Sequence, residues 1–203
     1  MNPEEFSKYV LPVFVTPVVN YRWPDSDVLN AELREFVLEM EKNEPSLNKS
    51  NVGGWHSALD FLARDAAPIQ ALRERLWEFS HNLLQQFSRP GEKPTIRIDG
   101  WANVLRHGQY HSVHSHPNAA WSGVYYVTGN EEIEGQPFSG RFELLDPRPG
   151  ASVNYAESST LYSRFLLNPS PGQMLVFPSW MQHQVHPYFG ENERITVAFN
   201  ILI

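Results

Sequence analysis

Three histidines have the residue type and the spacing to hold a metal ion. His114 and His116 lie two positions apart, so their side chains leave the same face if that segment is extended. His183 comes much later, at the end of the apolar segment 174–183. A neighbouring strand that brought His183 beside the pair would complete a three-point ligand face and leave other coordination positions open. The sequence therefore predicts a metal centre at these three residues.

An arginine near the end of the chain suggests a second chemical feature. Arg194 opens the apolar segment 194–203, and Thr196 points to the same side of an extended chain. A buried arginine is costly unless it meets an anion, and its planar fork suits a carboxylate. We expect Arg194 to bind an anion near the metal. The alternative is a solvated strand end that follows Glu191 and Glu193.

Composition limits the chemistry. The 203 residues include no cysteine, so a metal must be bound by His, Asp or Glu, and disulfides and thiolate catalysis are excluded. The net charge of −7 argues against a nucleic-acid partner. The first apolar run is broken by Pro12 and Pro17 and is too short to span a bilayer. We expect a cytoplasmic protein without membrane contact, with a homodimer left open.

The hydrophobic pattern predicts a single domain, mainly β with flanking α. Residues 1–95 read as helical support and a leading strand, and residues 96–203 read as the β core. Helical periodicity starts after Pro24 and again near Pro68, where it ends before Arg89. Strands are predicted around 95–106, 121–128, 140–145, 161–167, 173–178 and 194–203.

Several motifs together resemble the iron(II)/2-oxoglutarate dioxygenases. Four parts of the chain match that family's pattern: the segment from Asn103 through Gly108 to the histidine pair, the strand 121–127 with Tyr126, the turn and strand 171–183, and Arg194. More narrowly, the runs 122–126, 146–148 and 177–187 resemble an uncharacterised bacterial branch of 2OG-Fe(II) oxygenases. The resemblance covers roughly residues 97–203.

The resemblance implies a double-stranded β-helix, or jelly roll, with N-terminal supporting helices. It implies Fe(II) at His114, His116 and His183, 2-oxoglutarate as co-substrate and O2 as oxidant. The chemistry it implies is hydroxylation of a small molecule or peptide, coupled to decarboxylation of 2-oxoglutarate to succinate. The far carboxylate of 2-oxoglutarate would be held by Arg194, with help from Tyr126, Thr196, Ser122 and Asn103. An apolar wall around the metal is expected from Trp121, Trp180, Phe142 and Phe177.

One departure from the family pattern keeps alternatives open. Most of the superfamily has an acidic residue where this chain has His116, and three neutral imidazoles would leave the metal with one more unit of positive charge. Asp146 or Glu143 could instead be the third ligand, and the metal could be zinc or nickel. A cupin that does not use 2-oxoglutarate is a second alternative, although its expected glutamate is absent: positions 120 and 121 are Ala120 and Trp121. A non-catalytic metal or metabolite sensor is a third.

Overall fold

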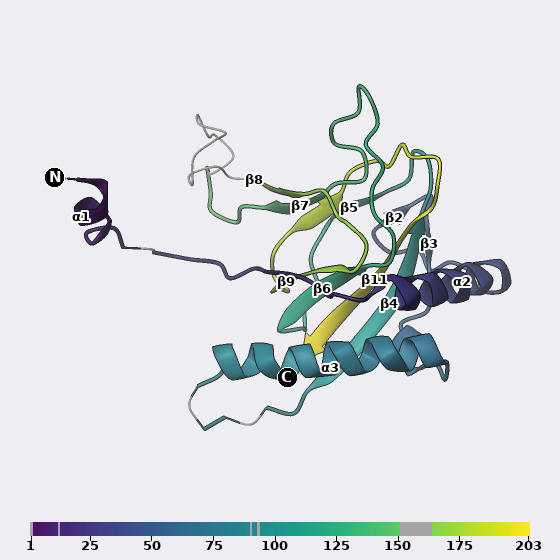
Figure 1. Cartoon of the computed structure of the whole chain (residues 1–203), viewed down its shortest axis with the longest axis horizontal. Coiled ribbons are helices and arrows are strands. Elements are labelled where there is room, and N and C mark those ends of the chain that lie inside the picture. The colour runs from purple at the N-terminus through teal and green to yellow at the C-terminus, as the bar shows by residue number, and fades with distance from the viewer. Residues whose placement is uncertain (1, 12, 90, 93, 151–163) are drawn as a thin grey trace.

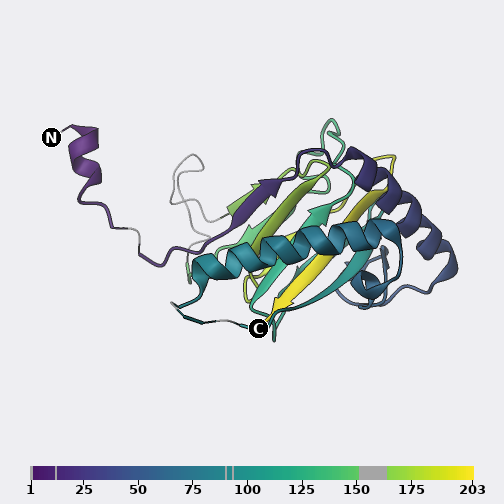
Figure 2. The ribbon, with the colours of Figure 1, turned by 60° about the horizontal axis from the view of Figure 1, so that its bottom comes forward.

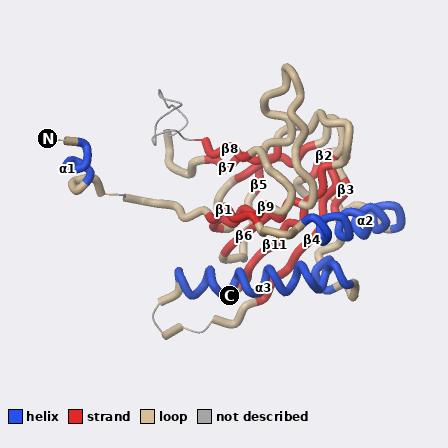
Figure 3. The backbone as a smooth tube through the Cα atoms, in the orientation of Figure 1, coloured by secondary structure: helices blue, strands red, loops and turns tan. Residues whose placement is uncertain are grey.

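The computed structural model describes residues 2–11, 13–89, 91, 92, 94–150 and 164–203. Within them the core is two antiparallel sheets that face each other, with two long helices packed on the outside of one sheet (Figure 1, Figure 3). This confirms the prediction of a mainly β chain with flanking helices. Among the described helices, none combines the length and the apolar character needed to cross a membrane.

The larger sheet has six strands. Their order across the sheet is β1 (Val19–Arg22), β9 (Gln173–Pro178), β6 (Trp121–Tyr126), β11 (Arg194–Leu202), β4 (Arg97–Leu105) and β3 (Trp55–His56). The two nine-residue strands, β4 and β11, pair along their whole length at the centre. Their register sets Thr196 opposite Asn103 and Tyr126, so these three predicted site residues form one row across the sheet.

The smaller sheet has five strands and lies over the larger one. Its order is β2 (Asn51–Val52), β5 (Tyr110–His114), β10 (His183–Val185), β7 (Phe142–Leu145) and β8 (Arg164–Leu167). The space between the sheets is filled by apolar side chains from both, including Leu105, Val124, Phe142, Phe177 and Val185. The part of the predicted strand at 161–163 lies outside the described residues.

The two long helices cover the outer face of the larger sheet (Figure 2). They are α2 (Asp27–Asn43) and α3 (Ala67–Phe87), and each buries apolar side chains at helical spacing, such as Leu29, Leu33 and Val37 in α2. Every third or fourth residue therefore meets the sheet, where Tyr125, Val197 and Phe199 complete the core. The prediction that both segments are helical cover is confirmed. The remaining helical elements are short: α1 (Pro3–Ser7) on the N-terminal arm and the 3-10 turn η1 (Phe61–Ala63).

Segment 1–95 contributes more strands to the sheets than the single leading strand that was predicted beside its helices. It supplies β1, β2 and β3, which pair with β9, β5 and β4 respectively. The sequence did not reveal β2 and β3 because each is only two residues long. Their placement brings the loop before β2, with Lys49 and Ser50, to the edge of the metal-binding region.

Candidate metal centre

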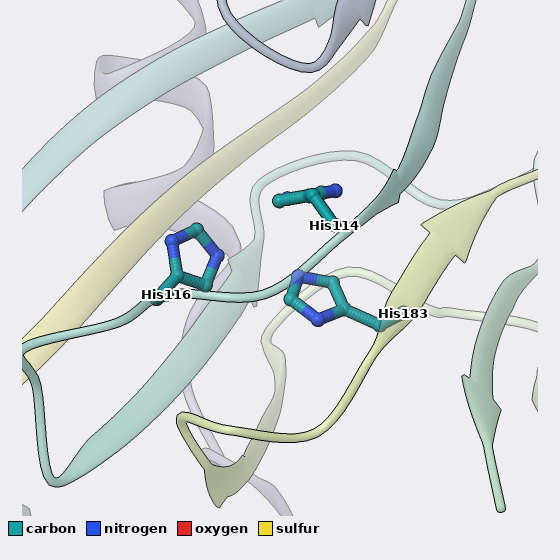
Figure 4. A group of neighbouring side chains, drawn as sticks. All are labelled: His114, His116 and His183. Carbon is teal, nitrogen blue, oxygen red and sulfur yellow. The ribbon is translucent and has the colours of Figure 1, made fainter. Parts of the chain in front are cut away.

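The structure brings the three predicted histidines together. Each offers one ring nitrogen, and the three nitrogens lie within 4.8 Å of one another (Figure 4). His114 ends β5 and stands opposite His183, the first residue of β10, in the strand register. His116 lies two residues beyond β5, where its backbone N–H donates to the Ser179 carbonyl at 3.0 Å. His116 therefore lies just beyond the end of the strand, and its ring reaches the same site as that of His114.

Backbone carbonyls orient two of the three rings. The His114 Nδ1 atom is 2.7 Å from the Ser112 carbonyl, and the His183 Nδ1 atom is 3.0 Å from the Met181 carbonyl. In the tautomer that makes these bonds, Nδ1 carries the proton and Nε2 keeps a free lone pair for a metal. Both rings are therefore prepared to ligate through Nε2.

The third ring is positioned by packing. Within the described residues the His116 ring makes no hydrogen bond, and its centroid lies 5.4 Å from that of Trp101. The Trp101 ring stacks in turn on His56, with 5.6 Å between centroids and 8° between planes. The His56 Nδ1 atom bonds the Ser57 carbonyl at 2.6 Å, so the stack behind His116 is fixed to the backbone. His56 and Trp101 carried no signal for this role in the sequence.

The histidines are in the protonation state that binds metal. Burial lowers the pKa of His114, takes that of His116 to about 4 and moves that of His183 well below the usual value for histidine. The three imidazoles are therefore neutral at physiological pH, which is the form of the ring that donates a lone pair.

The two carboxylates considered as alternative ligands are bonded to other groups. Burial alone would raise the pKa of Glu143, but hydrogen bonds from Arg164, Gln184 and His186 outweigh it and lower the value to about 2. Asp146 forms a pair with Arg148. Among the described residues, the group with metal-binding geometry contains the three histidines and neither of these acids.

A buried cation, Arg194, lines the same inner cavity as the histidines and has no anionic partner among the described residues. Arg194 is 1% exposed; its Nε atom donates to the Asn130 Oδ1 atom at 3.0 Å and to the Gly140 carbonyl at 3.1 Å. In the described part of the chain its Nη2 atom has no partner, and the same holds for the Tyr126 hydroxyl. Burial raises the pKa of Tyr126, so the phenol stays protonated and can donate.

These groups fit a bound carboxylate. The Arg194 guanidinium carbon lies 5.4 Å from the centre of the Tyr126 ring. A narrow cavity of about 50 Å³ connects this end to the histidines, and Arg194, Thr196, Asn103 and Ser122 line it. Buried donors without partners cost free energy unless a ligand meets them. Four of the five residues predicted to bind 2-oxoglutarate lie at this end: Thr196 stands opposite Asn103 and Tyr126 in the strand register, and the Tyr126 ring packs against the Arg194 guanidinium. Ser122 lines the cavity further along the sheet, where it stands opposite Asn200.

Some details of the predicted site are corrected. The Ser122 hydroxyl donates to the Asn200 Oδ1 atom at 2.7 Å, so its proton is already used. Phe142 and Phe177 line the cavity as predicted. Trp121 does not: it packs against Phe87 on the helix side of the sheet. Trp180 is 54% exposed and lines a different cavity.

A fourth histidine, His111, also faces the cavity, although it was not among the residues predicted to bind metal or 2-oxoglutarate. It is buried, and the Ser50 hydroxyl lies 3.2 Å from its Nδ1 atom and 3.3 Å from the His114 Nε2 atom. Strict alternation would place His111 and His114 on opposite faces. The register with β10 shifts between these positions, and such a β-bulge turns both side chains to one side.

Comparison with known proteins identifies the family of this chain. The profile of the family described as "Putative 2OG-Fe(II) oxygenase" matches residues 99–200, about half of the chain, and the chain belongs to that family. It is therefore an oxidoreductase of the class that uses Fe(II), 2-oxoglutarate and O2. This decides against the cupin alternative. No protein with a curated function matches the sequence.

Solved structures share the fold. A prolyl-4-hydroxylase from Pseudomonas putida aligns over 93% of each chain with a TM-score of 0.68 and 13% identity. The viral collagen prolyl hydroxylase of Paramecium bursaria Chlorella virus-1, solved with 2-oxoglutarate, aligns over 92% of this chain and 96% of its own, with a TM-score of 0.62 and 14% identity. HygX from Streptomyces hygroscopicus, with nickel and 2-oxoglutarate, covers 99% of this chain and 87% of its own at a TM-score of 0.61 and 12% identity. The fold is the double-stranded β-helix that the sequence motifs implied.

Proposed function

We propose that this oxygenase binds Fe(II) through His114, His116 and His183, holds the far carboxylate of 2-oxoglutarate at Arg194, and hydroxylates a small molecule or a peptide. The observation that carries the proposal is the buried Arg194 guanidinium, whose Nη2 atom lacks a partner among the described residues, beside three convergent neutral imidazoles. A metal and a dicarboxylate would satisfy both groups at once.

Different residues of the chain would bind the metal, bind the carboxylate and exclude water. The three histidines supply neutral nitrogen ligands from one side and leave the other side of the metal for anions and oxygen. The protonated Tyr126 and the Arg194 fork donate to the carboxylate, and Asn130 and Gly140 hold the guanidinium in position. Phe142 and Phe177 exclude water from the space between these two ends. When bound, iron and 2-oxoglutarate supply the oxidising chemistry, in which one oxygen atom goes to the substrate and the other to succinate.

A site of three histidines has an electrostatic consequence. With no carboxylate among the three, the full charge of a divalent metal faces its remaining ligands. We infer that this strengthens the binding of the 2-oxoglutarate anion.

A cytoplasmic location belongs to the same proposal. It rests on the absence of cysteine, which suits a reducing compartment but does not require one.

The test is turnover that depends on each part of the site. Purified protein is incubated in air with Fe(II), ascorbate and 2-oxoglutarate, and both succinate and oxygen consumption are measured. We expect succinate above the level given by the His183→Ala variant, together with loss of oxygen uptake when 2-oxoglutarate is omitted. Equal succinate from the two proteins would contradict the catalytic proposal and leave a binding or sensor role.

A further inference from the structure

A second cavity opens beside the histidines, on the side that does not include Arg194. Its volume is about 470 Å³, and it shares Ser50, Trp101, His114 and His116 with the narrow inner cavity. This volume is in the range of small-molecule sites. A larger hollow of about 680 Å³ exists elsewhere, but none of the three histidines lines it. The outer cavity is therefore the place where a substrate could meet the open side of the metal.

Most of the residues that line the outer cavity have a polar or charged side chain. Leu59 and Trp101 are its apolar lining residues, and the others carry hydroxyl, amide, imidazole or charged groups. Trp101 cannot act as a broad stacking surface, because one ring face lies against His56 and the ring is only 8% exposed. The cavity therefore offers hydrogen-bonding groups for a small polar molecule, while apolar atoms of the same side chains can contact its carbon skeleton.

Two opposite charges line this cavity. Lys49 comes from the loop before β2, and in the described residues its ammonium group forms no ion pair. Asp99 comes from β4 and receives one bond from Arg97 at its Oδ2 atom, at 3.2 Å, which leaves Oδ1 to accept another. The cavity thus offers a cation for a carboxylate and a carboxylate for a cation.

A neutral donor lies next to Asp99. Asn200 stands opposite Asp99 in the register of β4 and β11. Its Oδ1 atom accepts from Ser122, so the orientation of its amide is fixed and its nitrogen is left to donate into the cavity.

We propose that the outer cavity binds a small zwitterion of the amino-acid type, with its carboxylate toward Lys49 and its ammonium toward Asp99. The inference rests on the proposed function and names the substrate class of the same site. One C–H bond of the ligand is converted to C–OH: the carbon gains one atom of O2, its hydrogen ends on the new hydroxyl, and the second oxygen atom enters succinate as 2-oxoglutarate loses CO2.

Binding can be tested without turnover or iron, because both charges belong to the protein. Saturation-transfer NMR on the metal-free protein is recorded with the free L-amino acids and with the same compounds as α-amides. We expect at least one free amino acid to bind, and its amide to bind about tenfold more weakly, which is the loss of roughly one charge-assisted hydrogen bond. Lys49→Met should weaken the free acid to a similar extent, whereas Lys42→Met, an exposed lysine on α2 paired with Glu39, should not.

Three results would overturn the inference: no free amino acid binds, the amides bind as well as the acids, or Lys49→Met leaves the affinity unchanged. Asp99→Asn gives a second arm, with weaker binding expected for the free acid and little change for its N-acetyl derivative. The proposed function is judged separately by succinate formation and oxygen uptake in the presence of Fe(II) and 2-oxoglutarate. A failure of one experiment is therefore not mistaken for a failure of the other.

Discussion

The Arg194→Met variant separates a ligand-binding role from a structural one. Arg194 is a fully buried cation, and in the described residues no carboxylate pairs with it. Removing it relieves the desolvation cost of a buried charge but leaves the Asn130 and Gly140 oxygens without their donor. Because these effects oppose each other, we expect the free energy of unfolding of the ligand-free protein to change by no more than about 2 kcal/mol.

Binding of 2-oxoglutarate should change far more. Truncating one partner of a buried charge pair costs about 2–5 kcal/mol, so the dissociation constant should rise by about 30-fold or more. At a ligand concentration 100 times the wild-type constant, binding stabilises the wild type by about 2.7 kcal/mol. With a 30-fold weaker constant the same concentration gives about 0.9 kcal/mol. For a chain of this size that is the difference between a shift in Tm of about 5–11 °C and one of about 2–4 °C.

The assay is thermal unfolding under anaerobic conditions with metal present, with and without 2-oxoglutarate. Arg106→Met is the matched control, since Arg106 pairs with Glu41 on the surface and does not line the cavity. Its ligand-induced shift should equal that of the wild type. An unchanged shift in Arg194→Met would refute the assignment of Arg194 as the carboxylate anchor. A large loss of stability without ligand would show instead that the arginine is structural.

Three further predictions follow from the geometry. His116→Ala should weaken metal binding by at least about 100-fold, which competition with a chromophoric chelator measures. His116→Asp should retain the metal but bind 2-oxoglutarate less tightly, because the added negative charge opposes the anion. Calorimetry measures this second effect. Trp101→Leu should weaken metal binding by about 10- to 100-fold, because it removes the ring that holds His116, and Trp180→Leu should have no such effect. The pKa of Glu143 is lowered to about 2, so its contribution to stability is complete above the unfolded-state pKa and is lost as the pH falls toward 2. The urea midpoint of Glu143→Gln should therefore depend less on pH than that of the wild type between about pH 4.5 and 2. Parallel curves of urea midpoint against pH for the two proteins would contradict this.

Much of the site could be predicted from the sequence because its chemistry is carried by rare residue types at diagnostic positions. His183 and Arg194 each begin a strand, and the turn before β9 is marked by Gly172, whose φ of +77° favours glycine. The strands with alternating or continuous apolar residues were predicted to within a few residues, and β9 was placed at its observed bounds.

What the sequence could not show depends on irregular backbone and on long-range pairing. The bulge in β5 turns His111 toward the cavity, against the simple alternation of a strand. The two-residue strands β2 and β3 carry no periodic signal, yet their pairing sets Ser50 beside His114 and His56 behind Trp101. The sequence favoured His116 as the third ligand but left Asp146 and Glu143 as alternatives, since a carboxylate is usual at that place in the family. Strand pairing turns Glu143 toward Arg164 and away from the histidines.

The central claim is that three histidines, without a carboxylate, hold an iron ion to which 2-oxoglutarate binds as a chelating ligand. The most direct measurement is an anaerobic titration of the purified protein with Fe(II) and then 2-oxoglutarate, following the weak visible charge-transfer band of the chelate. We predict one iron per chain and a band that is lost in His114→Ala, His116→Ala and His183→Ala but kept in Glu143→Gln and Asp146→Asn. A band that survives in His116→Ala, or one that disappears in either carboxylate variant, would contradict the claim.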